Sequence, residues 1–290
     1  MSRMKVNLAG VELKNPVMTA SGTFGSGAEY SEFVDLNKLG AVVTKGVANV
    51  PWPGNPTPRV TETASGMLNA IGLQNPGIDV FCERDIPFLK KYATKDYCEV
   101  VERLGNEPVD MLEINVSCPN VKEGGIAFGQ NPKALEDITK EVKKYAKQPV
   151  IMKLSPNVTD ITEMAKAAEA GGADVLSLIN TLTGMKIDIN RRTFALANKT
   201  GGMSGPAVKP VAVRMVYQVA NAVSLPIIGM GGIATCEDAL EFIMAGATAV
   251  SVGTANFFNP YATEEIAEGI QAFLEKEKVE DINELIGVVK

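Results

Sequence analysis

The amino-acid sequence predicts an α/β protein, a (β/α)8 barrel in a single domain that spans residues 1–290. Short runs of β-branched and other apolar residues alternate with longer amphipathic stretches, a pattern typical of a parallel sheet built from βα units. Each run is apolar nearly throughout, as expected for a strand covered on both faces. The chain has 290 residues, 46% of them hydrophobic, and can therefore bury a core of this size.

The first expected element is a β-hairpin at residues 5–15 (KVNLAGVELKN), which would close the bottom of the barrel. The barrel strands follow as seven apolar runs. They are PVMTAS (16–21), GAVVTKG (40–46), DMLEINVS (110–117), PVIMKLS (149–155), DVLSLIN (174–180), LPIIGMG (225–231) and TAVSVGT (248–254).

Three helices lie before or between these strands and carry clear end signals. Residues 131–146 have a proline in the first turn and basic residues at the end, and residues 160–173 end in glycines. Residues 235–247 begin at a threonine cap with acidic residues close behind. This alternation of strand and helix is the repeat of a (β/α)8 barrel.

Two segments depart from the repeat. Residues 184–205 (GMKIDINRRTFALANKTGGMSG) are too long and glycine-rich for a plain βα loop, so they predict an inserted arm after strand 6. The seven runs are also one fewer than the barrel requires. Residues 86–105 pass from one helical pattern to another without an apolar run, so the third strand is expected to be missing near Lys95 and Asp96.

Composition and charge exclude several classes of function. The net charge is −6 and the basic residues are scattered, which argues against nucleic acid as a partner. Residues 1–16 lack the apolar core of a signal peptide, and no apolar stretch is long enough to cross a bilayer, so we expect a cytoplasmic protein without membrane contact. Cys82, Cys98, Cys118 and Cys236 have no metal-ligand spacing, so neither a disulfide framework nor a metal site is expected.

Function in such a barrel lies at the carboxyl ends of the strands. Here these ends carry polar residues on an apolar scaffold: Ser21, Lys45, Gly46, Asn115, Cys118, Lys153, Asn180, Thr181, Gly231, Gly232, Gly253 and Thr254.

The last two strand ends predict a phosphate site. GMGGI (229–233) and VGT (252–254) place glycines, whose amides can approach a ligand closely, just before expected helix N-termini. The loops after strands seven and eight are a frequent phosphate site in barrels. Tight turns alone would also explain these glycines, and a phosphate does not distinguish isomerases, lyases and flavoenzymes.

Lys45 and Lys153 each end an apolar strand, where a charge is costly to bury unless it faces a polar pocket or an anion. Lys153 would suit the electron-rich edge of a flavin ring. Two other roles stay open for it: a Schiff-base nucleophile, as in aldolase-type barrels, or an ammonium group that extends to solvent at the barrel mouth.

Amide and thiol side chains complete the candidate site. Asn69, Asn115, Asn120 and Asn180 both donate and accept, which suits a flat ligand with amide edges, although each alone is also a common turn or cap residue. Buried cysteines are usually inert. Cys118 nevertheless follows a strand end in a chain without histidine, and a thiol then has the unperturbed pKa closest to neutrality.

Over nearly its whole length the chain resembles the class 1 dihydroorotate dehydrogenases, and within them the catalytic subunit of the NAD-linked class 1B. The resemblance rests on MTASGTFG (18–25), TKGV (44–47), GNPTPRVTETASGMLNAIGLQNPG (54–77), EINVSCPNVKEGG (113–125), IMKLSPN (151–157), LINTLTGM (178–185), NKTGGMSGPAVKP (198–210), IIGMGGI (227–233) and SVGTA (251–255).

The resemblance implies an FMN enzyme that oxidises (S)-dihydroorotate to orotate in pyrimidine (UMP) biosynthesis. Cys118 would be the base that removes a proton from C5 of the substrate, while the hydrogen on C6 leaves as hydride to the flavin. Class 2 enzymes are expected to carry serine at this position. The fumarate-linked class 1A, or a non-redox phosphate-binding aldolase or isomerase barrel, is the alternative.

Partners and contacts follow from the same resemblance. A second subunit would carry FAD and a 2Fe-2S cluster and pass electrons to NAD, in a heterotetramer built on a homodimer of this chain, which itself has no cluster-type cysteine array and no GxGxxG loop. FMN contacts are implied for Ser21, Lys45, Gly46, Asn115, Lys153, Ile179, Gly205, Gly231, Gly232, Gly253 and Thr254. Substrate contacts are implied for Lys45, Asn69, Ala70, Ile71, Gly72, Leu73, Asn115, Asn180 and Thr181.

The chain departs from the family at one place. A strand of the type IIVNVxG, which brings another flavin-contacting asparagine, is expected between the residues matching 92–95 and those matching 96–98, and it is absent here. Losing about a dozen residues at this place would leave the neighbouring strands without ladder hydrogen bonds. We therefore expect the complete protein to contain them, whereas a true deletion would give little soluble protein and no flavin.

Overall fold

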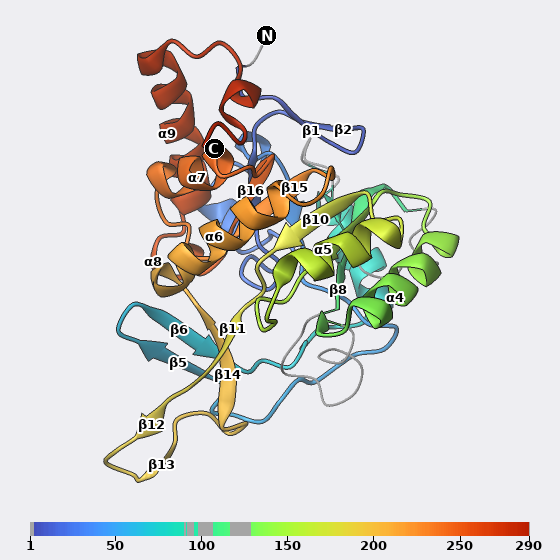
Figure 1. Ribbon diagram of the computed structural model, residues 1–290. Helices are drawn as coiled ribbons and strands as arrows, with labels where there is room; N and C mark the ends of the chain where they lie inside the picture. The colour runs from blue at the N-terminus through green and yellow to red at the C-terminus, as the bar shows by residue number, and fades with distance from the viewer. Residues whose placement is uncertain (1–2, 90, 92–95, 98–106, 117–128, 290) are drawn as a thin grey trace.

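The structure is a computed structural model that describes residues 3–89, 91, 96–97, 107–116 and 129–289. Its centre is an eight-stranded parallel sheet surrounded by helices (Figure 1). The strands are β3 (Val17–Thr19), β4 (Val42–Val43), β7 (Asp96–Tyr97), β8 (Val109–Asn115), β9 (Val150–Lys153), β10 (Val175–Leu178), β15 (Ile227–Met230) and β16 (Ala249–Val252).

The sheet closes on itself. The strand order is β3-β16-β15-β10-β9-β8-β7-β4, and a parallel bridge between Met18 and Ala41 joins the two outer strands. Strands β9, β10, β15 and β16 are buried at every position, because barrel side chains fill one face and helices cover the other. All seven expected runs form strands, which confirms the barrel prediction.

The third barrel position is occupied, but only by a two-residue strand. β7 pairs in parallel with β4 and β8, and its register with β8 shifts between Asp96 and Tyr97. The third strand, expected to be missing near Lys95 and Asp96, is thus present as the short strand β7. β7 has only two residues, whereas the neighbouring strand β8 has seven.

The N-terminal hairpin is also confirmed. β1 (Val6–Leu8) pairs antiparallel with β2 (Val11–Leu13) across Ala9 and Gly10, both of which have positive φ angles. Leu8 is fully buried and belongs to the main core cluster. In Figure 1 the hairpin lies at the end of the barrel opposite the protruding strands β12 and β13.

The main helices cover the outside of the barrel. They are α4 (Pro132–Tyr145), α5 (Ile161–Ala170), α6 (Lys209–Ala220), α7 (Cys236–Met244) and α9 (Ala262–Glu277). Shorter helical segments are η1 (Tyr30–Glu32), η2 (Leu36–Lys38), α1 (Ile78–Val80), η3 (Phe81–Asp85), α2 (Ile86–Leu89), η4 (Pro206–Val208), α8 (Ala255–Phe258) and η5 (Ile282–Leu285).

The three expected helices begin at side-chain caps. Asn131 and Asp160 accept hydrogen bonds from backbone N–H groups in the first turns of α4 and α5. Thr235 and Asp238 form a capping box at the start of α7. Because these caps satisfy N–H groups that have no partner within the helix, they explain where each helix starts.

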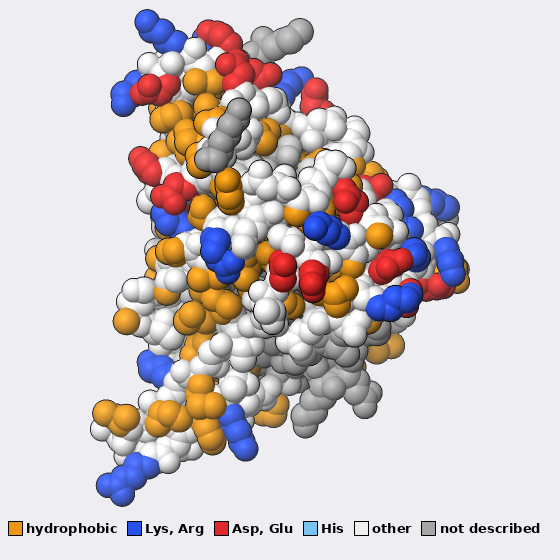
Figure 2. Space-filling model, viewed as in Figure 1, with side chains coloured by type: hydrophobic (Ala, Val, Ile, Leu, Met, Phe, Trp, Pro, Cys, Tyr) orange, Lys and Arg blue, Asp and Glu red, His pale blue; other side chains and the backbone are white. Residues whose placement is uncertain are grey.

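The inserted arm is confirmed, and it pairs with a second hairpin. Its strands are β11 (Leu182–Met185), β12 (Ile187–Asp188), β13 (Thr193–Phe194) and β14 (Thr200–Ser204), and the second hairpin is β5 (Val60–Thr63) with β6 (Gly66–Asn69). β11, β14, β6 and β5 form one antiparallel sheet, here called the arm sheet. Apolar side chains gather on the protruding arm (Figure 2), and Ile189 at its tip is 80% exposed.

No helix among the described residues combines the length and the apolar character needed to cross a membrane.

Candidate active site

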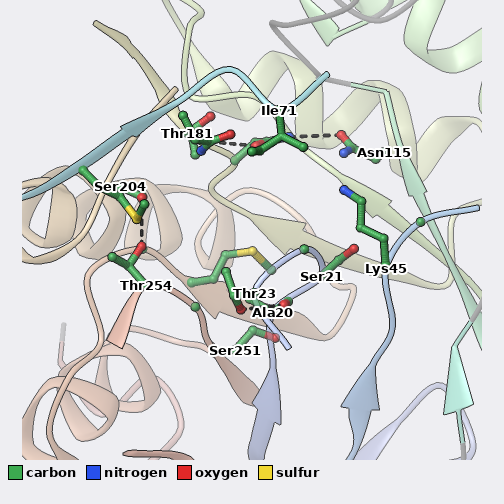
Figure 3. Close-up of a pocket in the computed structure, with 18 of the residues that line it drawn as sticks. Ala20, Ser21, Thr23, Lys45, Ile71, Asn115, Thr181, Ser204, Ser251 and Thr254 are labelled. Carbon is green, nitrogen blue, oxygen red and sulfur yellow. Dashed lines mark hydrogen bonds between the residues drawn. The ribbon is translucent and has the colours of Figure 1, made fainter. Parts of the chain in front are cut away.

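The carboxyl ends of the barrel strands open into a cavity of about 400 Å³, whose other side is formed by the arm sheet (Figure 3). A volume of about this size falls within the range typical of ligand pockets. The expected site residues that line it are Ser21, Lys45, Gly46, Asn69, Ile71, Gly72, Leu73, Asn115, Lys153, Ile179, Asn180, Thr181, Gly231, Gly232, Gly253 and Thr254.

Two expected residues do not line this cavity, and two others lie outside the described residues. Ala70 is fully buried and does not line the cavity, because neighbouring residues of an extended segment face opposite sides. Gly205 lines an adjoining cavity of about 260 Å³, which shares Gly232 and Thr254 with the first. Cys118, expected to be the catalytic base, lies outside the described residues, as does Asn120.

Cationic side chains reach the cavity from two strands. Lys45 points into it from the chain just after β4 (Figure 3). Lys153 ends β9, and its Nζ lies 3.2 Å from Oε1 of Glu113 on β8. Both side chains of this ion pair are only 7% exposed. Two ammonium groups that line one cavity favour anionic ligands such as phosphate or carboxylate.

Amide groups form a hydrogen-bonded wall at the arm side of the cavity. The Asn180 Nδ2 donates to Oδ1 of Asn115 at 3.0 Å, and the Thr181 N–H donates to Oδ1 of Asn180 at 2.8 Å. Asn157 supports the wall from behind, since its Nδ2 donates to the Thr181 carbonyl at 3.0 Å. The wall is thus held in place before a ligand binds, as a specific polar site requires.

The opposite end of the cavity is rich in glycine. Gly231 and Gly232 follow β15 with positive φ angles, and Gly253 and Thr254 follow β16. The Thr254 hydroxyl donates to Oγ of Ser204 at 2.8 Å, which ties the barrel to the arm sheet (Figure 3). Backbone amides without side chains around them suit a phosphate group.

Lys209 braces this glycine-rich end. Its backbone packs beside Gly232, and its ammonium donates to Asp238 at 2.6 Å and to Glu241 at 2.8 Å. The hydrogen bond to Asp238, followed by that to Glu241, raises the pKa of Lys209. Lys209 therefore stays charged and holds the start of α6 against α7, on both sides of the loop after β15.

Sequence reasoning missed several residues of the cavity region. Thr23, Ser204, Ser251 and Phe257 line the cavity, and Glu113 and Ser177 contact Lys153 or its partner. For Glu113 a signal was available, because it precedes Asn115 by two residues and so faces the same side of β8. For Ser204 the sequence offered no signal, because the position of this residue depends on pairing between distant strands.

Together the fold and the cavity define a (β/α)8-barrel protein with a polar, lysine-lined cavity at the carboxyl ends of its strands. Residues 3–274 match the family model for dihydroorotate dehydrogenase. The chain therefore belongs to the dihydroorotate dehydrogenase family.

Individual relatives agree with this assignment. The catalytic subunit of dihydroorotate dehydrogenase B (NAD(+)) from Lachnoclostridium phytofermentans is 73% identical, with 98% of this chain and 99% of the relative covered. The subunit of the same name from Alkaliphilus metalliredigens is 66% identical, with 98% of each chain covered. The dihydroorotate dehydrogenase of Eimeria tenella, solved with ferulenol, shares the fold with a TM-score of 0.80 at 23% identity, over 99% of this chain and 89% of that one.

The alignment with the Lachnoclostridium subunit also includes unmatched positions. It runs over 296 positions but takes in 98% of this 290-residue chain, about 284 residues, so about a dozen positions of the relative have no counterpart here. Their number is close to the length of about a dozen residues expected for the absent segment near Lys95 and Asp96.

Proposed function

We propose that this chain is the catalytic subunit of an NAD-linked dihydroorotate dehydrogenase, which binds FMN and oxidises (S)-dihydroorotate to orotate in pyrimidine biosynthesis. One observation carries the proposal. In this chain, which is 73% identical to a catalytic subunit of dihydroorotate dehydrogenase B (NAD(+)), one cavity contains two lysines, an amide wall and a glycine-rich end. Each of these features suits a chemical group of FMN or of dihydroorotate.

The chain's own residues divide between cofactor and substrate. Gly231, Gly232, Gly253 and Thr254 would hold the phosphate of FMN, and Lys153 would stabilise negative charge on its ring. Further cofactor contacts come from Ser21, Lys45, Gly46, Asn115, Ile179 and Gly205. When bound, FMN supplies a ring that accepts a hydride.

Substrate binding falls to the amide wall and to Lys45. The Lys45 ammonium would pair with the substrate carboxylate, and Asn69, Asn115, Asn180 and Thr181 would hydrogen-bond the ring amides, beside the segment 70–73. Cys118 would take the proton from C5, while the hydrogen on C6 leaves with its electron pair. The substrate thus loses one proton and one hydride and becomes orotate.

The contacts of Lys153 argue against a Schiff-base mechanism. A lysine must be an uncharged amine to attack a carbonyl group. Lys153 instead lies in a buried ion pair with Glu113, which supports a fixed positive charge at this position. An aldolase-type reaction is therefore the weaker proposal.

In the proposed NAD-linked reaction, the electrons leave through a partner. We propose that the chain pairs with a subunit carrying FAD and a 2Fe-2S cluster, in a cytoplasmic heterotetramer built on a homodimer of this chain. The printed name of the relatives, catalytic subunit, supports a separate partner.

Anaerobic flavin reduction tests the proposal. The purified chain should be yellow, and dihydroorotate should bleach its flavin absorbance without oxygen. Addition of the partner subunit and NAD should then restore the absorbance as NADH forms. A colourless protein whose lysine is trapped with substrate by borohydride would favour the aldolase alternative, and flavin that dihydroorotate does not bleach would refute the assigned reaction.

A Gly202→Ala substitution should impair substrate use selectively. Gly202 lies on β14, and a Cβ there would fall 2.6 Å from Cβ of Thr181. The displaced Thr181 would lower kcat/KM for dihydroorotate by about a hundredfold, the scale expected for a shift of about 1 Å at a substrate contact. The FMN content should stay at the wild-type level.

Gly184→Ala is the matched control in the same arm sheet. Its added Cβ would lie 3.0 Å from the end of the Leu68 side chain and 3.7 Å from Cβ of Met203, so it is less crowded than the Cβ added at Gly202. Equal losses in the two variants, or wild-type kinetics for Gly202→Ala, would contradict the placement of Thr181 at the substrate.

A further inference from the structure

A buried carboxylate lies beneath the cavity, and the proposed reaction does not use it. Glu113 is 5% exposed and sits on β8 two residues before Asn115, so both side chains face the barrel interior. Its Oε1 accepts from Lys153 Nζ at 3.2 Å, and its Oε2 accepts from the Ser177 hydroxyl at 3.0 Å.

Three neighbouring strands build this network. β9 lies between β8 and β10, and Lys153 is in register with Asn115 on one side and with Ser177 on the other. Ser177 is fully buried. Each oxygen of the Glu113 carboxylate therefore has its own partner, and the carboxylate is fixed from two directions by side chains that are almost fully buried.

Strand cohesion alone does not require such a network. Buried ion pairs are often no more stabilising than well-packed apolar side chains of similar volume, because both charges must be removed from water. The neighbouring positions of β8, β9 and β10 hold their strands together with apolar residues. The ion pair lies where the barrel interior meets the cavity, and its lysine lines that cavity.

We propose that Glu113, fixed by Ser177, is a positioning residue that holds the Lys153 ammonium at the floor of the cavity and sets how strongly its charge acts on the flavin ring. The inference rests on the proposed function, because it takes FMN as the ligand above Lys153. A free lysine side chain has four rotatable bonds, and the carboxylate restricts them to one arrangement before the cofactor binds.

Substitutions of Glu113 can separate the effect of its negative charge from the effect of its side-chain length. Glu113→Gln keeps the length of the side chain but removes the negative charge, so more of the Lys153 charge acts on the ring at low dielectric. The midpoint potential of the flavin should then become more positive. Glu113→Asp keeps the charge but shortens the reach, so the potential should stay close to wild type while FMN binding weakens.

The experiment measures two quantities for each variant: the midpoint potential of the bound flavin, and the Kd of FMN for the apoprotein by fluorescence titration. Glu113→Ala removes the carboxylate that holds Lys153. It should raise this Kd by about tenfold, the scale on which supporting partners of a ligand-binding group act. Ser177→Ala should shift the potential in the direction expected for Glu113→Gln and the Kd in the direction expected for Glu113→Ala, both by less. Glu169→Gln is the control, because it makes the same chemical change at a carboxylate that binds Ser224 on the surface.

The outcomes are distinguishable. A more positive potential in Glu113→Gln, with the control unchanged, supports the inference. An unchanged potential and Kd, even with lower thermal stability, would show that Glu113 only packs the barrel. If Glu113→Gln does not fold, the midpoint potential and the FMN Kd of Ser177→Ala and Glu113→Asp test the inference instead. A wild-type protein that binds no FMN would overturn the proposed function instead.

Discussion

A Cys118→Ser variant is expected to retain FMN and bind orotate, yet to reduce its flavin about 10² to 10⁴ times more slowly at neutral pH, the range over which a positioned general base contributes. The reason is basicity. A thiol ionises within reach of neutral pH, whereas a serine hydroxyl is a far poorer base without a neighbouring group to activate it. The chain has no histidine to serve in that capacity. Stopped-flow mixing with dihydroorotate under anaerobic conditions measures the rate.

Cys236→Ser is the control for this variant. Cys236 begins α7, and burial together with Glu237 raises the pKa of its thiol, so it is a poor candidate for a base. Its substitution should leave flavin reduction unchanged. Wild-type reduction kinetics in Cys118→Ser would refute the assignment of the base, whereas loss of FMN would point to a structural defect.

The sequence predicted the barrel well because its strands are covered on both faces. Such strands must be apolar almost throughout, and this leaves a signal that does not depend on distant partners. The same regularity located the cavity, because the carboxyl ends of parallel strands meet at one end of a barrel. Lys45, Asn115 and Lys153 could therefore be grouped before their distances were known.

Features that depend on pairing between distant segments were harder to predict from the sequence. Ser204 reaches Thr254 only because the arm joins the hairpin β5–β6, and nothing in either segment specifies that pairing locally. Glu113 and Ser177 were not predicted as site residues, because they lie inside the barrel rather than at a strand end. The short strand β7 was invisible to pattern analysis, because two residues are too few to show a hydrophobic period.

Gly232→Ala is expected to weaken flavin binding strongly. Gly232 has φ +83°, and a Cβ there would lie 2.8 Å from the Gly205 carbonyl oxygen and 3.0 Å from the Lys209 backbone nitrogen. Backbone atoms on two sides cannot move apart without displacing the start of α6, which the bonds from Lys209 to Asp238 and Glu241 hold in place. The loop would open where the phosphate should bind. We expect an FMN Kd raised by about a hundredfold or more, since an overpacked site costs about 1–3 kcal/mol and the left-handed backbone adds about 1–2 kcal/mol.

Gly172→Ala separates the clash from the backbone strain. Gly172 has a similar φ of +89°, but its added Cβ would meet only the Lys143 side chain at 3.8 Å, and the residue lies in the turn between α5 and β10, away from the cavity. This control should lose about 1 kcal/mol of stability and keep its flavin. If both variants lose FMN, general destabilisation is the cause. If Gly232→Ala binds FMN as tightly as wild type, the phosphate does not lie against this loop, and the proposed orientation of the cofactor in the cavity is wrong.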